Sequence, residues 1–182
     1  MNSDFSIAVD DQSIATITWD CKNKSMNVLT FEALETLDNL INQVIEDDKI
    51  SACILTSSKK DFAAGMDLNV LAQLKESVGE NPAEGVFNGL LKMHSVLRKI
   101  ELAGMDIKTK KGGKPIVSVL PGTALGIGLE IPLSTHRIFS ANNSKAKIGL
   151  PEILVGLFPG AGGTTRLVRK LGAMAASTYL LE

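Results

Sequence analysis

The chain has 182 residues, a length that predicts one domain with a sizeable core. Its 19 basic and 20 acidic residues leave a net charge of −1, which argues against a nucleic-acid-binding protein because such proteins carry a basic excess. A hydrophobic fraction of 45% and a charged fraction of 21% exclude a disordered chain. Half of the 16 glycines lie between residues 122 and 163, which indicates a loop-rich site in that region.

Several other classes of protein are excluded by features that the sequence lacks. Cys21 and Cys53 form neither a disulfide framework nor a metal-binding pattern, so we expect a reducing compartment and no metal site. The first residues have the pattern of neither a signal peptide nor a transit peptide, and we therefore predict a cytoplasmic protein. The apolar stretch over residues 115–133 contains prolines, glycines and a carboxylate, which argue against a membrane span. Zinc-protease, serine-hydrolase and P-loop motifs are absent.

The first half of the chain predicts a hairpin and then alternating helices and strands. Alternating apolar and polar residues predict strands over residues 5–9 and 14–19. Thr30 is expected to cap a helix in which apolar residues from Phe31 to Val44 recur at helical spacing. A buried strand over residues 52–56 is followed by a loop to residue 65 and by a helix that starts near Met66 and Asp67.

The second half continues the alternation. We predict a loop over residues 77–85, an amphipathic helix over 86–102 and an exposed basic excursion over 103–114. A β-branched strand over residues 116–120 leads into a helix from about Gly128, a strand over 137–140 and a helix from about Ala161. This order predicts the α/β class and a single domain over residues 1–182.

Two carboxylates lie among the glycines. Glu130 follows Gly126 and Gly128 where a strand feeds a helix, and free N–H groups at a helix start can stabilise an oxyanion. Glu152 precedes a second glycine-rich loop that also enters a helix. When two carboxylates share one cleft, their charges repel each other and their two pKa values move apart, which suits acid–base catalysis. From the residues alone, a structural role stays open, with Glu130 satisfied by the helix dipole and Glu152 exposed in a turn.

Three ordered segments resemble motifs of the enoyl-CoA hydratase/isomerase, or crotonase, family. The segment FAAGMDL over residues 62–68 is similar to the family's AAGxDL motif. The segment from Lys114 to Glu130 is similar to its KPVxAxxxGxALGGGxE motif, and the segment from Gly149 to Thr164 resembles its FGxPExxxGxxPGxGGT motif. The segment around His136 is most similar to the hydratase region of multifunctional fatty-acid oxidation α subunits.

The resemblance implies a fold, a reaction and a set of site residues. The fold would be a spiral of ββα units from which the C-terminal helices of the family are missing. The reaction would be hydration of a trans-2-enoyl-CoA, with Glu130 and Glu152 as the catalytic pair and the backbone N–H groups of Met66 and Ile127 as the oxyanion hole. Further substrate contacts would come from Lys24, Ser25, Ala64, Asp67, Leu68 and Gly126. No cofactor is implied beyond the CoA thioester substrate, and the resemblance implies a homo-oligomer or a thiolase-containing complex.

The chain departs from the family pattern at several positions. Ile127 replaces the middle glycine of the usual GGG, which keeps the backbone donor but adds a β-branched side chain to the pocket. His136 stands where many hydratases have Asp, and we expect it to hold a strand. Lys108, Lys110 and Lys111 are expected to be a solvated charge run. Two alternatives to a hydratase remain open, namely a Δ3-Δ2-enoyl-CoA isomerase and a non-catalytic acyl-CoA-binding or assembly module.

Overall fold

The computed structural model describes residues 3–70 and 81–181, and it contains one five-stranded sheet covered by helices. The chain starts with the antiparallel pair β1 (Phe5–Val9) and β2 (Ile14–Trp19), as the alternating pattern predicts. The strands β3 (Ala52–Ser57), β4 (Ile116–Leu120) and β6 (Arg137–Ser140) then add in parallel, giving the order β1-β2-β3-β4-β6.

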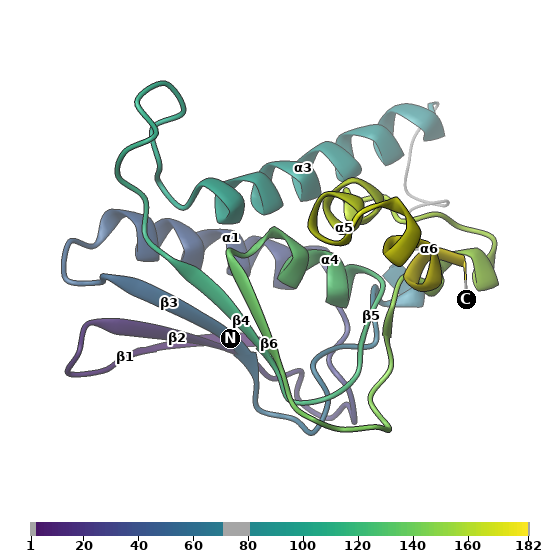
Figure 1. Cartoon of the computed structure of the whole chain (residues 1–182), viewed down its shortest axis with the longest axis horizontal. Helices are drawn as coiled ribbons and strands as arrows, with labels where there is room; N and C mark the ends of the chain where they lie inside the picture. The colour runs from purple at the N-terminus through teal and green to yellow at the C-terminus, as the bar shows by residue number, and fades with distance from the viewer. Residues whose placement is uncertain (1–2, 71–80, 182) are drawn as a thin grey trace.

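One face of this sheet is buried and forms the floor of the core. Ile17 of β2 pairs with Leu55 of β3, and Leu55 pairs with Ser118 of β4; all three are fully buried. Residues between them are more exposed, as expected for strands whose side chains alternate between two faces. Figure 1 shows the helices gathered on the buried side of the sheet. Burial of this single face fixes the register of the strands, because a shift by one residue would turn the core side chains to solvent.

The two long helices that cover the sheet each begin after a residue whose side chain caps the helix. Helix α1 (Phe31–Glu46) starts after Thr30, whose hydroxyl accepts a hydrogen bond from the Ala33 N–H at 3.1 Å. Helix α3 (Pro82–Leu102) lies against α1 and starts after Asn81, whose side chain accepts from the Glu84 N–H. The predicted loop over residues 77–85 is therefore wrong from Pro82 onward, and residues 77–80 lie outside the described residues. Asn81 followed by proline is itself a helix-start signal.

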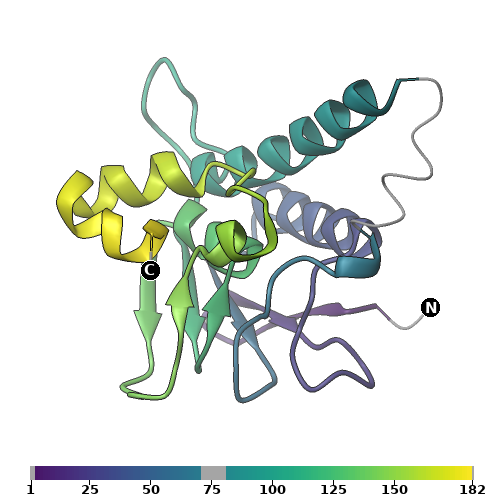
Figure 2. The ribbon, with the colours of Figure 1, turned by 90° about the vertical axis from the view of Figure 1, so that its right-hand side faces the viewer.

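The remaining elements lie in the glycine-rich region and after it. They are β5 (Ala124–Leu125), α4 (Ile127–Ser134), β7 (Ile148–Gly149), the short 3₁₀ helix η1 (Pro151–Val155), α5 (Gly163–Leu171) and α6 (Ala173–Leu181). Strands β5 and β7 form a separate parallel pair. Helix α5 packs against α4 and α6, and Figure 2 shows this yellow end of the chain beside α4. The two-residue strands β5 and β7 were not among the predicted elements.

Three further predictions concern the basic excursion, His136 and a membrane span. The basic excursion before β4 projects away from the body of the molecule in Figures 1 and 2, and Lys108, Lys110 and Lys111 are exposed, as predicted. His136 holds β6 to β4, because its Nδ1 accepts a hydrogen bond from the Ile116 N–H at 3.0 Å. Within the described ranges, no helix combines the length and the apolar character that crossing a bilayer requires.

Asn27 connects the hairpin to the loop that reaches the candidate site. It is fully buried; its Oδ1 accepts from the Cys21 N–H at 2.8 Å, and its Nδ2 donates to the carbonyl oxygens of Trp19 and Phe62 and to the Ser57 hydroxyl. The Asn27 side chain therefore makes hydrogen bonds to four other residues. A buried polar group is costly to leave unpaired.

We expect Asn27→Ala to lower the free energy of unfolding by about 3 kcal/mol, because it removes the partner of the buried Cys21 N–H and of the Phe62 carbonyl. The exposed Asn39→Ala in α1 serves as the matched control and should change it by less than about 0.5 kcal/mol. Urea denaturation of the three proteins measures both values. Equal stability of the two variants would contradict the role given to Asn27.

Candidate active site

The loop that carries Met66 is held by a single parallel bridge to the segment before α1. The Leu29 N–H donates to the Gly65 carbonyl at 2.9 Å, and the Asp67 N–H donates to the Leu29 carbonyl at 2.9 Å. In a parallel bridge, the residue between Gly65 and Asp67 directs its own N–H group away from the segment that contains Leu29. The Met66 N–H therefore points away from Leu29, and it has no acceptor among the described residues.

A second set of backbone bonds joins this loop to the glycine-rich segments. The Leu125 N–H donates to the Ala63 carbonyl at 3.0 Å, and the Gly126 N–H donates to the Gly149 carbonyl at 3.1 Å. These bonds place the start of α4 beside the Met66 loop on one side and beside η1 on the other. The three segments that resemble family motifs therefore converge in space.

Ile127 is the first residue of α4, and its N–H has no partner within the helix. It also has no acceptor elsewhere in the part of the chain that the structure describes. The partial positive charge of the helix start adds to the field at this point. Met66 and Ile127 both line the same cavity, so the two residues whose N–H groups have no acceptor in the described chain meet there. The isoleucine side chain forms part of the wall and is 5% exposed.

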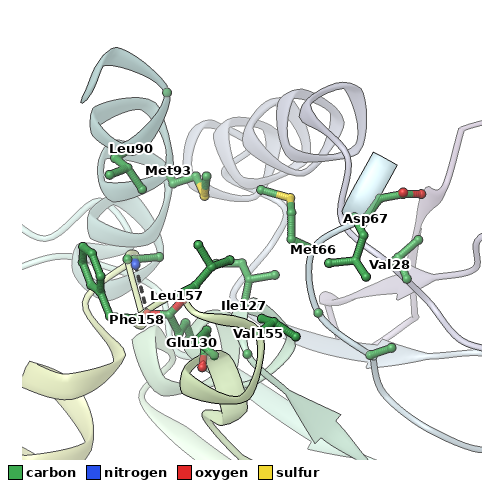
Figure 3. Close-up of a pocket in the computed structure, with 18 of the residues that line it drawn as sticks. Val28, Met66, Asp67, Leu90, Met93, Ile127, Glu130, Val155, Leu157 and Phe158 are labelled. Atoms are coloured by element: carbon green, nitrogen blue, oxygen red, sulfur yellow. Dashed lines mark hydrogen bonds between the residues drawn. The ribbon is translucent and has the colours of Figure 1, made fainter. Parts of the chain in front are cut away.

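The cavity has a volume of about 640 Å³ and lies between α3, α4, η1 and the Met66 loop. Figure 3 shows apolar side chains on most of its wall, with the Glu130 carboxylate at its base. The apolar lining residues are Val28, Phe31, Ala64, Leu68, Val86, Leu90, Met93, Pro151, Val155, Leu157, Phe158 and Ala161, together with Met66 and Ile127. A cavity of this kind suits a largely apolar ligand that carries a few polar groups.

Glu130 is buried in α4 with 2% of its surface exposed, yet its carboxylate has two partners. Its Oε1 accepts from the Gly163 N–H at 2.7 Å and from the Ala161 N–H at 3.0 Å. Gly163 lets the backbone come this close, because a Cβ at that position would lie 2.8 Å from the carboxylate oxygen. The loop before α5 thus forms a cradle for the Glu130 carboxylate, which we call the Glu130 cradle (residues 161–163).

Glu152 enters the cavity from η1. An added Cβ on Gly126 would lie 3.2 Å from Glu152 Oε1, so the carboxylate lies against the turn that starts α4. The other oxygen, Oε2, is buried and has no hydrogen-bond partner among the described residues. A buried polar atom without a partner that faces a cavity is a candidate contact for a ligand or a reacting water.

The two carboxylates hold protons more tightly than ordinary glutamates do. Burial, together with the charge of Glu152, raises the pKa of Glu130 to about 7, although the N–H groups of Gly163 and Ala161 and the charge of Arg166 oppose the rise. Burial also raises the pKa of Glu152. Groups that titrate near neutral pH are suited to move protons in a reaction.

The charged residues at one end of the cavity pair with each other. Lys24 Nζ lies 2.5 Å from Asp67 Oδ2, and the other oxygen of Asp67 accepts from the Asn69 N–H at 2.9 Å. These two contacts lower the pKa of Asp67, Lys24 having the larger effect. Asp67 therefore caps residues 68–70, which are helical, as the sequence predicts for a helix that starts near it.

Most of the predicted site residues meet at this cavity. The predicted residues on its lining are Glu130, Glu152, Met66, Ile127, Lys24, Ala64, Asp67, Leu68 and Gly126. Ser25 is exposed and does not line the cavity, so its contact with substrate stays a prediction. No group of three or more His, Cys, Asp or Glu side chains suited to a metal ion occurs among residues 3–70 and 81–181.

Three features of the site were missed in the sequence. The donors of the Glu130 cradle were not identified, although glycines before a helix are a signal for exposed N–H groups. The cavity-facing stripe of Val86, Leu90 and Met93 on α3 was recognised only as the apolar face of a helix. Arg166, which contacts the cradle from α5, was not singled out.

This geometry defines the class of chemistry that the cavity can perform. Two free N–H groups can stabilise negative charge that develops on a carbonyl oxygen, and two carboxylates with raised pKa values can exchange protons with the neighbouring carbons or a water. Comparison with known proteins identifies the family. The chain belongs to the enoyl-CoA hydratase/isomerase family, whose model matches residues 10–182.

Relatives and solved structures agree with this assignment. The fatty acid oxidation complex subunit alpha of Idiomarina loihiensis is 32% identical over 178 residues, which cover 97% of this chain and 23% of that protein. The corresponding subunit of Shewanella amazonensis is 31% identical, with 100% of this chain and 24% of that protein covered. The chain thus spans about a quarter of the length of these relatives.

The fold is the crotonase fold predicted from the sequence. The crystal structure of an enoyl-CoA hydratase from Bacillus anthracis matches with a TM-score of 0.79 at 27% identity and covers 98% of this chain and 62% of that chain. An enoyl-CoA hydratase from Thermoplasma volcanium matches with a TM-score of 0.79 at 26% identity and covers 99% of this chain and 64% of that chain. Both neighbours extend beyond the region matched here.

The raised pKa of Glu130 makes stability depend on pH. The pKa is about 7 in the folded chain against an ordinary value of 4.5, so the folded state binds the proton more tightly and loses stability as pH rises from about 4.5 to about 7. This difference corresponds to about 3 kcal/mol. Glu130→Gln cannot ionise, and we expect its stability relative to the parent chain to grow by about 3 kcal/mol between pH 4 and pH 8.

Urea denaturation at both pH values measures this change. The exposed Glu46→Gln at the end of α1 is the matched control, and its stability difference from the parent chain should stay nearly constant with pH. A constant difference for Glu130→Gln as well would show that Glu130 ionises normally in the folded chain.

Proposed function

We propose that the chain catalyses the addition of water to trans-2-enoyl-CoA thioesters, giving 3-hydroxyacyl-CoA. The observation that carries this proposal is the meeting of the buried Glu130 carboxylate, the half-buried Glu152 carboxylate and two backbone donors, which have no acceptor among the described residues, at one apolar cavity. Membership of the enoyl-CoA hydratase/isomerase family supports it, as do relatives named for fatty acid oxidation. A fatty acyl tail suits the apolar wall.

The backbone donors account for activation of the substrate. Addition of water at Cβ of an enoyl thioester moves negative charge onto the thioester oxygen. The N–H groups of Met66 and Ile127 would donate to that oxygen, and a single donor of this kind is worth about 3 kcal/mol of transition-state stabilisation. The donors belong to a bridged loop and to a helix start, so they need no rearrangement as the charge develops.

The carboxylates account for the proton transfers. Glu130 accepts two backbone N–H bonds that favour its charged form, and we assign it as the base that removes a proton from the attacking water. Glu152 has an oxygen without a donor in the described chain, which favours the protonated form, and we assign it as the acid that delivers a proton to Cα. The water oxygen bonds to Cβ, its proton goes to Glu130, and the proton of Glu152 completes the product. No cofactor takes part.

Lys24 lies at one end of the cavity and is 46% exposed at its side chain. We propose that this end receives the polar part of CoA, with Ala64 and Leu68 beside the pantetheine and the acyl chain directed toward α3. Oligomerisation or assembly into a larger complex remains a proposal that the family resemblance suggests.

The central test is hydration of a short enoyl-CoA, followed as loss of the absorbance of the conjugated thioester. We expect the parent chain to remove this absorbance and Glu130→Gln and Glu152→Gln each to lower kcat by about a thousandfold, because each removes one proton-transfer group. Glu46→Gln should retain full activity. Full activity in both active-site variants would contradict the proposal.

Two further measurements separate hydration from the alternatives. A 3-enoyl-CoA substrate tests isomerisation, because formation of the 2-enoyl product by a chain that does not hydrate it would identify an isomerase. Calorimetry tests a binding module, because tight binding of acyl-CoA without any turnover would favour an acyl-CoA-binding role over an enzyme.

A further inference from the structure

A buried arginine lies against the Glu130 cradle and is not on the lining of the cavity. Arg166 lies on α5, and its side chain is 10% exposed. Its NH1 group donates to the Ala161 carbonyl at 2.8 Å. A Cβ on Gly162 would lie 2.7 Å from the same NH1 group, so the guanidinium lies directly against the cradle.

Arg166 is itself anchored to a second helix. Its Nε lies 3.4 Å from Glu101 Oε1 on α3, which is an ion pair and not a hydrogen bond. Glu101 Oε2 accepts from Arg98 NH1 at 2.6 Å. Burial disfavours ionisation of Glu101, but the two arginines outweigh it and lower the pKa of this carboxyl. The arginine side chain thus connects α3 to the loop that holds Glu130.

We propose that Arg166 is a positioning residue for Glu130 and that Glu101 anchors it. The peptide carbonyl that Arg166 binds lies between the two peptide groups that donate to Glu130 Oε1. Fixing the Ala161 carbonyl fixes the direction of both neighbouring N–H groups. The catalytic part of this proposal rests on the proposed function, because Glu130 is a reacting group only in the proposed hydration.

The planar guanidinium explains why this position suits arginine. One edge donates to a carbonyl while another faces a carboxylate, which a lysine ammonium cannot do with the same geometry. The charged or titratable groups that surround the cradle are Glu152 on η1, Arg166 on α5, and His94 and Glu101 on α3, with His94 Cε1 3.6 Å from the Cβ position of Gly162. Among these, Arg166 is the cation that favours the charged form of Glu130.

The amide signals of Ala161 and Gly163 report on this arrangement without any turnover. We would record them by NMR in protein labelled with ¹⁵N at alanine and glycine, between pH 5 and pH 9, with Glu130→Gln as the reference that does not titrate. In the parent chain both amide protons should follow the ionisation of Glu130, because they donate to its carboxylate.

We expect Arg166→Met to move both signals toward those of free amides and to raise the titration midpoint by about one pH unit. Arg166→Lys should keep the midpoint near that of the parent chain, because it keeps the charge, and still move the amide signals. The exposed Arg169→Met on the same helix is the matched control and should change neither. Unchanged signals and an unchanged midpoint in a folded Arg166→Met would overturn the proposal.

Two additional measurements keep the test decisive. If Arg166→Met does not fold, Glu101→Ala takes its place in the NMR experiment, because Glu101 is only partly buried. We expect Glu101→Ala to shift the Gly163 amide signal, and an unshifted signal would overturn the proposal.

In the hydration assay, Arg166→Met should lower kcat about tenfold with little change in KM and move the acidic limb of the pH profile to higher pH. A parent chain without hydratase activity would contradict the proposed function, while the NMR result would still decide the role of Arg166.

Discussion

The burial of the Glu130 carboxylate is the constraint on which the rest of the site depends. A buried carboxylate is costly unless it is paired or hydrogen-bonded, and here the compensation comes from two N–H groups of a loop that lies 31 and 33 residues later in the chain. Helix α4 and the start of α5 must therefore pack against each other, and Gly163 must lack a side chain. These hydrogen bonds do not fully offset the cost of burying the charge, so the pKa of Glu130 is about 7.

A small number of backbone bonds brings the other site residues to this carboxylate. The bridge between Leu29 and Met66 and the pairing of β5 with β7 place two free N–H donors and Glu152 around one cavity. These elements are short and lie outside the main sheet, which α4 contacts at β6. The five-stranded sheet does not line the cavity, and the chemistry is concentrated on loops and helix starts, where backbone donors are available.

The sequence predicted the parts of the fold that have strong local patterns. The hairpin, the helix capped by Thr30, and the strands β3, β4 and β6 all have alternating, β-branched or capping residues that indicate their type. The first turn of α3 was predicted as loop because Gly85 and the polar residues before it resemble a linker, although Asn81 and Pro82 mark a helix start. Strands β5 and β7 have two residues each, and no local pattern identifies a pair that exists only through tertiary contacts.

The features of the candidate site also fall into those that the sequence predicts and those that depend on tertiary packing. Glu130, Glu152, Met66 and Ile127 could be named because they stand in motifs that resemble a known family. The donors to Glu130 and the contact of Arg166 with Ala161 depend on how α3, α4 and α5 pack, and no spacing in the sequence reveals these distances. Likewise, the pKa of Glu130 follows from its burial beside Glu152, which becomes visible only once both side chains line one cavity.

The most direct test of the site as a whole is a crystal structure with a bound saturated acyl-CoA, which cannot be hydrated. We expect the thioester oxygen to accept hydrogen bonds from both the Met66 and Ile127 N–H groups, with Glu130 and Glu152 facing Cα and Cβ of the acyl chain. A thioester bound outside this cavity, or one whose oxygen contacts neither donor, would contradict the arrangement described for this protein.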